Sequence, residues 1–383
     1  MDIEFDLVLQ GGKVVDPSQH IHERMDVGFK DGKVKAISRQ ISSTRSKEII
    51  DVTGDLVTPG LIDLHGHFAH LIVPFRAEPD EANLPFGVTT AVDTGSTGWM
   101  NFPGFKTYVI EKATTRILAF IHISAIGSCT VRIGIPDLED FRLARTKETV
   151  DCINEHKDIL LGTKVRLGPT GTTSTNAIDA LKKAREIADN TGTLVMVHVM
   201  ETDIPLSTVF EHLTPGDIIT HCFHGDTHNV LDKDQNIRPE VWEAYRNGII
   251  FDTGCFAKHF SIPICRTAIR QGMPPHTLST DRIGEDHPVE IKYSLLDVMS
   301  MFLELGMSLE EVIESVTSRP ASVIGRTDLG TLKPGAEGDA VVLRLSGESI
   351  KYPDLLGNEI VANRNFTAKI TVKSGKTWTP TKN

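Results

Sequence analysis

The sequence has few of the features that mark secreted, disulfide-rich proteins. It contains 5 cysteines in 383 residues, and none of them forms a C-x-x-C pair. An odd number of scattered cysteines favours reduced thiols over a disulfide framework. We therefore expect a cytoplasmic protein with five free thiols, at Cys129, Cys152, Cys222, Cys255 and Cys265.

Long apolar runs and excess positive charge are also missing. No run approaches the ~20 apolar residues that a bilayer-spanning helix needs. The 51 acidic residues outnumber the 40 basic ones, and the formal net charge of -11 makes nucleic-acid binding a poor expectation. Three of the first six residues are acidic and none is basic, whereas a secretory signal begins with basic residues. We expect a small-molecule substrate, no nucleic acid and no membrane as partners, and a homo-oligomer.

Short β-branched runs separated by turn residues occupy both ends of the chain. Runs broken by Gly11-Gly12 and by Asp31-Gly32 predict antiparallel hairpins near the N-terminus. Residues 338–343 and 368–372 show the same pattern of short β-branched runs, which predicts strands near the C-terminus. Because neither end alone has enough strands for a stable sheet, we expect residues 1–58 and 327–383 to form one small β-sandwich domain.

The middle of the chain, residues 59–326, alternates apolar runs with helix-forming segments. Clear helices are predicted over residues 176–190, 239–247 and 308–313. This alternation predicts an α/β fold, a (β/α)8 TIM barrel. A doubly wound open sheet is the alternative, but no G-x-G-x-x-G follows a strand to support it. The eight predicted strands are 61–67, 88–95, 117–127, 160–166, 194–198, 217–221, 248–253 and 277–281.

Histidines stand at the end of the first predicted barrel strand. His65 and His67 are two residues apart, so they share one face of a strand and can present imidazoles to the same ion. Alone, this pair could also be two solvated side chains. Other strands end similarly, with His198, His221 and Asp281, and Lys164 interrupts an apolar run. Catalytic residues of barrels gather at the C-terminal ends of strands, so we expect these six side chains to converge.

These positions resemble the amidohydrolase superfamily, in particular its dihydroorotase- and hydantoinase-like members with two metal ions. The resemblance spans nearly the whole chain. It is carried by P-G-L-I-D-L-H-G-H at residues 59–67, Lys164, the strand ends at His198 and His221, S-T-D at 279–281, T-S-R-P-A at 317–321 and G-T-L-K-P-G-A-E-G-D-A at 330–340.

The resemblance implies a role for each of the six residues. It makes His65 and His67 ligands of the more buried metal, Lys164 a bridging carbamate formed with carbon dioxide, and His198 and His221 ligands of the second metal. Asp281 becomes the last ligand and the proton shuttle. Zinc is the expected metal, with manganese, iron and cobalt left open by the ligand types. Two such ions would activate a bridging water for attack.

A narrower resemblance points to a deacetylase- or esterase-like branch, and therefore to an ester or amide of a small acylated acid. Arg166 lies two residues after Lys164 on the same strand face, where a guanidinium could clamp a substrate carboxylate. Arg282 directly follows Asp281 and is a second candidate for contact with an anionic substrate. For both arginines the alternative is an ordinary ion pair with an acidic residue. Weaker candidates for substrate contact are His224, Cys255 and His259, with a hydrogen-bonded loop histidine or a buried thiol as the alternative.

Two other functions remain open at this point. A cyclic-amide hydrolase or an aminopurine deaminase could use the same metal ions. A non-enzymatic scaffold of this fold would have lost metal ligands, whereas all six ligand positions are filled here.

Overall fold

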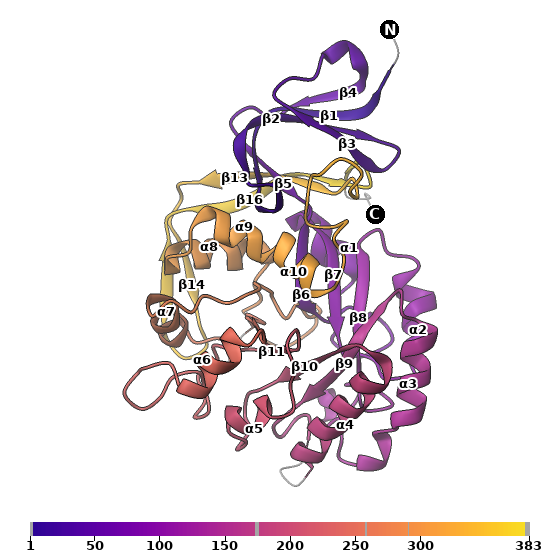
Figure 1. Cartoon of the computed structure of the whole chain (residues 1–383), viewed down its shortest axis with the longest axis vertical. Coiled ribbons are helices and arrows are strands. Elements are labelled where there is room, and N and C mark those ends of the chain that lie inside the picture. The colour runs from indigo at the N-terminus through magenta and orange to yellow at the C-terminus, as the bar shows by residue number, and fades with distance from the viewer. Residues whose placement is uncertain (1–2, 173–175, 257–258, 290, 380–383) are drawn as a thin grey trace.

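The computed structural model describes residues 3–172, 176–256, 259–289 and 291–379. The strands at the two ends of the chain form one sheet in the order β17-β16-β13-β5-β1-β2-β3, with β4 paired to β1 (Figure 1). Both chain ends therefore build the same β-structure. Its strands are β1 (Phe5–Asp16), β2 (Ile21–Lys30), β3 (Lys33–Ser38), β4 (Ser46–Asp51), β5 (Leu56–Pro59), β13 (Ala340–Ser346), β16 (Asn365–Lys373) and β17 (Lys376–Trp378).

The N-terminal hairpins follow the sequence prediction only in part. Strands β2 and β3 form the antiparallel hairpin expected around Asp31-Gly32. Both turn residues have positive φ, 50° and 77°, as a tight hairpin turn requires. The hairpin expected at Gly11-Gly12 is wrong, because β1 continues through these residues with a register shift against β2. Gly11 has a φ of 79°, and its N–H donates to Asp26 Oδ1 at 2.7 Å, so it forms a bulge.

The middle of the chain forms a parallel sheet that closes on itself, which confirms the barrel prediction. Seven strands follow one another in chain order, from β6 to β12. The predicted eighth strand is not assigned as one, but its backbone bridges β12 through Thr277 and β6 through Arg282, and so closes the barrel. The strands are β6 (Leu61–Gly66), β7 (Val88–Thr94), β8 (Arg116–His122), β9 (Leu160–Arg166), β10 (Leu194–His198), β11 (Ile218–Thr220) and β12 (Ile250–Asp252).

Strand β8 ends earlier than its apolar sequence predicts. It stops at His122, where the prediction extended to residue 127. The Ser124 N–H donates to His122 Nδ1 at 2.9 Å, and Ser124 then bridges Ala144 in antiparallel fashion. The chain therefore turns into a long connection over the C-terminal mouth of the barrel.

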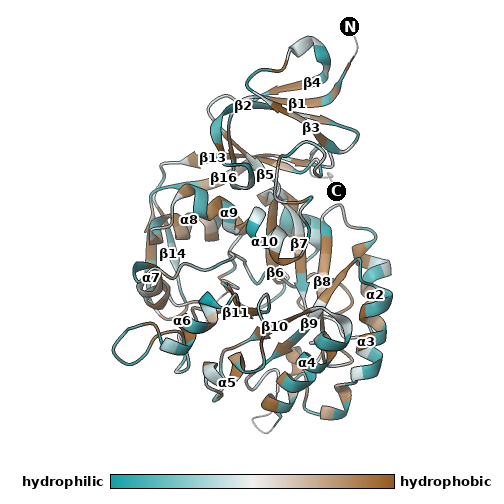
Figure 2. Ribbon diagram, in the orientation of Figure 1, coloured by the Kyte–Doolittle hydropathy of each residue, from teal (hydrophilic) through white to brown (hydrophobic). Residues whose placement is uncertain are grey.

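Helices pack on the outside of the barrel strands. In Figure 2 the strands β8, β9 and β10 are largely hydrophobic, whereas α4 and α6 also carry hydrophilic residues. The sequence of α4 explains its packing: Ala180, Ala184 and Ala188 recur every four residues and are buried. Helix α4 ends at Gly192 in the left-handed conformation, close to its predicted end. No helix in the described ranges has both the length and the apolar character that a membrane crossing requires.

The helices have the following bounds: α1 (Pro79–Asn83), α2 (Phe102–Phe105), α3 (Thr146–Glu155), α4 (Ala177–Thr191), α5 (Leu206–Phe210), α6 (Pro239–Arg246), α7 (Ile262–Arg270), α8 (Leu295–Leu305), α9 (Leu309–Ser315) and α10 (Ser318–Val323). Short helical turns span Pro17–Gln19, Ser43–Arg45, Leu84–Phe86, Lys106–Ile110, Val131–Ile133 and Phe141–Leu143. A separate hairpin, β14 (Ile350–Pro353) with β15 (Glu359–Ala362), carries Leu355 in its connecting turn.

A half-buried histidine outside the barrel mouth makes the stability of this fold depend on pH. The ring of His276 stacks on Tyr245 at 4.2 Å, and its Nδ1 accepts the Phe251 N–H at 3.0 Å. Burial, with a contribution from Arg319, lowers the pKa of His276 to about 4. At pH values above the ordinary histidine pKa of 6.5, the ring is neutral and the folded state has its full stability. This stabilisation is lost as the pH falls toward 4, because the unfolded chain takes up a proton that the folded protein does not.

We expect this linkage to contribute about 2–3 kcal/mol to the free energy of unfolding at pH 7. The variant His276→Gln does not titrate, so its unfolding free energy should change less than that of the parent between pH 7 and pH 4.5. Urea unfolding at both pH values measures the difference. Since the two proteins share all other titrating groups, an identical pH dependence would show that His276 is not the group responsible.

Candidate metal centre

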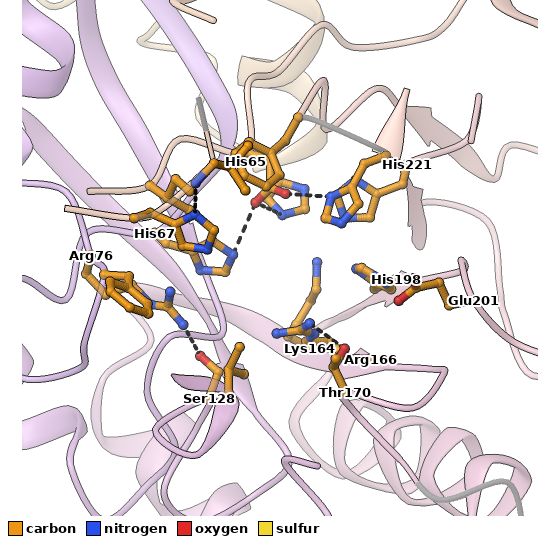
Figure 3. Close-up of a pocket in the computed structure, with 18 of the residues that line it drawn as sticks. His65, His67, Arg76, Ser128, Lys164, Arg166, Thr170, His198, Glu201 and His221 are labelled. Atoms are coloured by element: carbon orange, nitrogen blue, oxygen red, sulfur yellow. Dashed lines mark hydrogen bonds and ion pairs between the residues drawn. The ribbon is translucent and has the colours of Figure 1, made fainter. Parts of the chain in front are cut away.

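A cavity of about 230 Å³ opens at the C-terminal ends of the barrel strands (Figure 3). All six residues predicted to converge line this cavity, and each is at most 8% exposed. They come from the ends of four strands and from the segment that closes the barrel. These residues are His65 and His67 on and after β6, Lys164 on β9, His198 on β10, His221 after β11, and Asp281.

Three of these side chains already form a cluster of suitable size for a metal ion. One ligand atom from each of His65, His221 and Asp281 lies within 4.8 Å of the others. The Asp281 Oδ1 atom is 3.4 Å from His65 Nε2 and 3.2 Å from His67 Nε2. His198 lies beside His221, with ring centroids 4.4 Å apart. Imidazole nitrogens and a carboxylate therefore converge on one volume, as the sequence predicted.

Hydrogen bonds at Nδ1 orient these imidazoles. His221 Nδ1 donates to the Gly254 carbonyl oxygen at 3.0 Å. The Thr220 hydroxyl donates to Asp252 Oδ2 at 2.7 Å and can therefore accept from His65 Nδ1, 2.6 Å away. In both rings the Nε2 atom keeps its lone pair for a ligand. Outer contacts of this kind fix the tautomer of metal-binding histidines.

The backbone at two of the candidate ligands is strained. His221 and Asp281 have φ values of 63° and 54°, a region that non-glycine residues rarely occupy. Such conformations cost roughly 1–3 kcal/mol each and occur mainly at functional sites. Gly254 permits the arrangement, because a Cβ atom there would lie 2.4 Å from His221 Nδ1.

Lys164 is the most unusual residue of the cavity. It is 1% exposed, and its Nζ has no hydrogen-bond partner among the described residues. Figure 3 shows its amine pointing toward the group of imidazoles. Burial lowers the pKa of Lys164 to about 7, so a large fraction of the amine is neutral at neutral pH. Gly95 makes room for the stem, since a Cβ there would lie 2.8 Å from Lys164 Cβ and Cγ.

The protonation states suit the binding of a cation. Burial lowers the pKa of all four imidazoles at the site, so that they are neutral at pH 7. Burial acts to raise the pKa of Asp281, but the neighbouring histidines outweigh it and hold this pKa well below its usual value. The site therefore offers lone pairs and one carboxylate anion.

Two of the five residues considered for substrate contact, His259 and Arg166, also line the cavity. His259 Nδ1 lies 2.9 Å from Asp281 Oδ2. Arg166 donates from Nη2 to the Thr170 hydroxyl at 2.8 Å, and its Nη1 is 3.7 Å from the buried carboxylate of Asp137. Their proposed contact with substrate stays a prediction.

The structure does not place His224, Cys255 and Arg282 on the cavity. Arg282 Nη2 donates to Glu285 Oε1 at 2.7 Å, which is the ordinary ion pair considered as the alternative. Cys255 is fully buried, and burial raises its pKa well above the usual range, so it is an inert thiol. His224 is 1% exposed, and its Nδ1 accepts the Asp226 N–H at 3.2 Å.

Several lining residues lie in connections that carried no signal in the sequence. Arg76 is the most notable, since it is only 7% exposed and donates to the Ser128 hydroxyl at 2.5 Å. Glu201 also faces the cavity. Apolar side chains complete the wall, among them Phe75, Phe256, Ile283, Val289 and Leu355.

Comparison with known proteins agrees with this geometry. Residues 261–378 match the family described as the amidohydrolase family. A deacetylase of Brucella anthropi is 32% identical over 343 residues, which cover 90% of this chain and 85% of the relative. A solved adenine deaminase structure is 28% identical with a TM-score of 0.90, and covers 98% of this chain and 100% of that one. A solved dihydroorotase structure is 30% identical with a TM-score of 0.87, and covers 97% of each chain. Because the chain matches the amidohydrolase family and is 32% identical to a relative along most of both chains, it belongs to the amidohydrolase family of hydrolytic enzymes.

Proposed function

We propose that the enzyme removes an acyl group from a small carboxylate-bearing compound, such as an acylated amino acid or hydroxy acid. The observation that carries this proposal is the combination of two features in one cavity. Neutral imidazoles and an anionic Asp281 form its inner end, and two guanidinium groups, those of Arg76 and Arg166, also face it. The deacetylase of Brucella anthropi, similar along most of its length, supports the same reaction class.

The residues present fit a pair of divalent metal ions, and zinc is the ion that we propose. The donor set is imidazole nitrogen with carboxylate oxygen. The Nδ1 atoms of His65 and His221 are taken up by Thr220 and Gly254, which leaves both Nε2 atoms to a ligand, and His65, His221 and Asp281 lie close enough together to share one ion. His65, His67, His198, His221 and Asp281 would hold the ions. When bound, such ions polarise a scissile carbonyl and acidify water.

Lys164 is proposed to complete the site as a carbamate. Its amine is buried without a hydrogen-bond partner in the described part of the chain, in a position that favours an anionic group once cations are bound. A neutral amine attacks carbon dioxide, so that one N–C bond forms, the π bond of one C=O breaks and one proton is released. The resulting carbamate carries one negative charge shared by two oxygens, and it would offer both oxygens to bound cations, which an ammonium group cannot do.

Asp281 is proposed as the proton carrier of the reaction. A water molecule that attacks the acyl carbon must lose a proton, and the leaving group must gain one. The Asp281 carboxylate lies at the centre of the cluster, with Oδ2 held by His259 at 2.9 Å. It is therefore positioned to accept the proton and to return it.

A cyclic-amide hydrolase or an aminopurine deaminase is the second candidate, because the chain superposes closely on a dihydroorotase and on an adenine deaminase. The two guanidinium groups in the cavity favour substrates that carry a negative charge. Adenine is uncharged and offers a buried guanidinium no anionic partner, whereas dihydroorotate and acylated acids carry a carboxylate. The proposal therefore places aminopurines last.

The test combines metal analysis with a substrate screen. Protein purified without chelator should contain about two divalent ions per chain, and chelation should abolish hydrolysis. The screen should include N-acyl amino acids, O-acyl hydroxy acids, hydantoins, dihydroorotate and aminopurines. Acid release from the acylated acids is the expected result. Protein without bound metal, or activity that survives chelation, would exclude the metal-dependent reaction, and preferential deamination of adenine would replace the proposed substrate class.

A further inference from the structure

Arg76 is a buried cation without an ion-pair partner in the described part of the chain. It is 7% exposed and lines the cavity, and its Nε has no hydrogen-bond partner among the residues that the structure describes. Within the same residues, its guanidinium makes one hydrogen bond, from Nη2 to the neutral Ser128 hydroxyl. Burying an unpaired charge is costly, so a guanidinium in this state is expected to receive an anion from outside the protein.

Three carboxylates near Arg76 attract its guanidinium without forming an ion pair with it in the described part of the chain. They belong to Asp93, Asp137 and Asp281. Asp93 accepts the N–H groups of Phe68 and Ser96, at 2.7 and 2.9 Å. Asp281 contacts the imidazoles of the metal site. These carboxylates partly balance the positive charge of the region, but none of them forms an ion pair with Arg76 in the described part of the chain.

Arg166 is in a different position, because the protein already supplies its counter-charge. Its Nη1 is 3.7 Å from Asp137 Oδ2, and Asp137 is fully buried behind it. His122 Nε2 lies 3.4 Å from the same oxygen. Thr170 holds the other end of the guanidinium. An incoming anion at Arg166 would therefore have to compete with a fixed carboxylate.

We propose that Arg76, rather than Arg166, binds the anionic group of the substrate and determines the preference for acids. This proposal rests on the proposed function, from which it takes the acylated acid as substrate. Arg76 then acts as the specificity residue, Ser128 positions its guanidinium, and Arg166 forms part of the cavity wall. In Figure 3 the Arg76 guanidinium lies next to Ser128 on the His67 side of the cavity, apart from the Lys164 and Arg166 side.

The test uses pairs of substrates that differ only in the charge of the acid group. Acetate release is measured for the best N-acetyl amino acid or O-acetyl hydroxy acid of the screen and for its primary amide. The parent enzyme is compared with Arg76→Met, Arg166→Met and, as a control for the loss of one positive charge, Arg39→Met. Arg39 is exposed on the terminal sheet and pairs with Glu23 at 3.2 Å.

Arg76→Met should lower kcat/KM for the acid about 100-fold, the usual consequence of removing one partner of a buried charged contact. The loss on the amide should be at least about tenfold smaller. Arg166→Met should lower kcat/KM for both substrates by similar factors, and Arg39→Met should match the parent. Arg76→Lys should recover part of the acid preference, since it restores the charge but not the two-pronged contact.

Ser128→Ala gives a test that does not depend on how well Arg76→Met folds. It keeps the cation but removes its hydroxyl partner, so KM should rise by a larger factor for the acid than for its amide. Selective loss of acid hydrolysis in Arg166→Met, with equal losses in Arg76→Met, would overturn the proposal and leave the proposed function intact. A parent enzyme that shows no preference for any acid over its amide would instead contradict the proposed substrate class itself.

Discussion

Replacing Lys164 by alanine is expected to remove most of the bound metal and to lower turnover at least about 100-fold. Even the outer partners of metal ligands are typically worth ~10–100-fold in affinity or activity, and the proposed carbamate is a direct ligand. The reason lies in the position of the side chain. Lys164 is 1% exposed and its Nζ has no hydrogen-bond partner in the described ranges, so alanine leaves a cavity among the imidazoles with no bridging group.

Chemical rescue distinguishes a carbamate from a lysine that acts as an amine. Short-chain carboxylic acids should partly restore metal binding and turnover to Lys164→Ala, because they supply the two missing oxygens. Metal content is measured by elemental analysis beside the activity. Lys182→Ala, on the exposed face of α4, is the matched control and should behave as the parent. Full activity in Lys164→Arg would contradict the carbamate, since a guanidinium does not react with carbon dioxide.

The convergence of the six candidate ligands could be predicted because these residues lie where strand pattern and fold coincide. Strands β9 (Leu160–Arg166) and β10 (Leu194–His198) have the bounds that their apolar runs predict. A parallel barrel brings the ends of all its strands to one mouth, so a polar residue at a strand end has a defined position. Lys164 was conspicuous for the same reason, as a charged residue within a buried strand.

The cavity wall could not be predicted, because its residues belong to connections whose course depends on distant contacts. Arg76 is held by Ser128, 52 positions further along the chain. Leu355 reaches the cavity from a hairpin near the C-terminal end. Neither position stands out by periodicity or by a motif. Binding residues lie disproportionately on connections of this kind, which explains why the sequence indicated the class of reaction more sharply than the substrate.

Closure of the barrel also depends on long-range contacts. Residues 277–282 pair too irregularly to be a regular strand, yet they link β12 to β6. Asp63 on β6 accepts the Thr280 hydroxyl at 2.5 Å and the Thr280 N–H at 3.2 Å. These bonds place Asp281 next to His65, whose carbonyl accepts the Asp281 N–H at 2.8 Å. The carboxylate thus reaches the metal site through a side-chain contact 217 residues apart in the sequence.

The position of Asp281 leads to the second large effect, in the variant Asp281→Asn. Asparagine keeps the shape of the side chain and can still accept hydrogen bonds, but it has no charge and does not take up a proton at neutral pH. Turnover should fall by ~100-fold to 10,000-fold, the usual contribution of a positioned acid–base group. Much of the metal should remain, because His65, His67, His198, His221 and Lys164 are unchanged.

The measurement that isolates this role is turnover per bound metal ion, obtained from kcat and elemental analysis of the same sample. Asp286→Asn, an exposed carboxylate five residues further along the chain, is the matched control and should retain the parent value. A fall of less than about tenfold in turnover per metal would assign the proton transfer to another group. His259 would then be the first residue to test, because its ring is 2.9 Å from Asp281 Oδ2 and lines the same cavity.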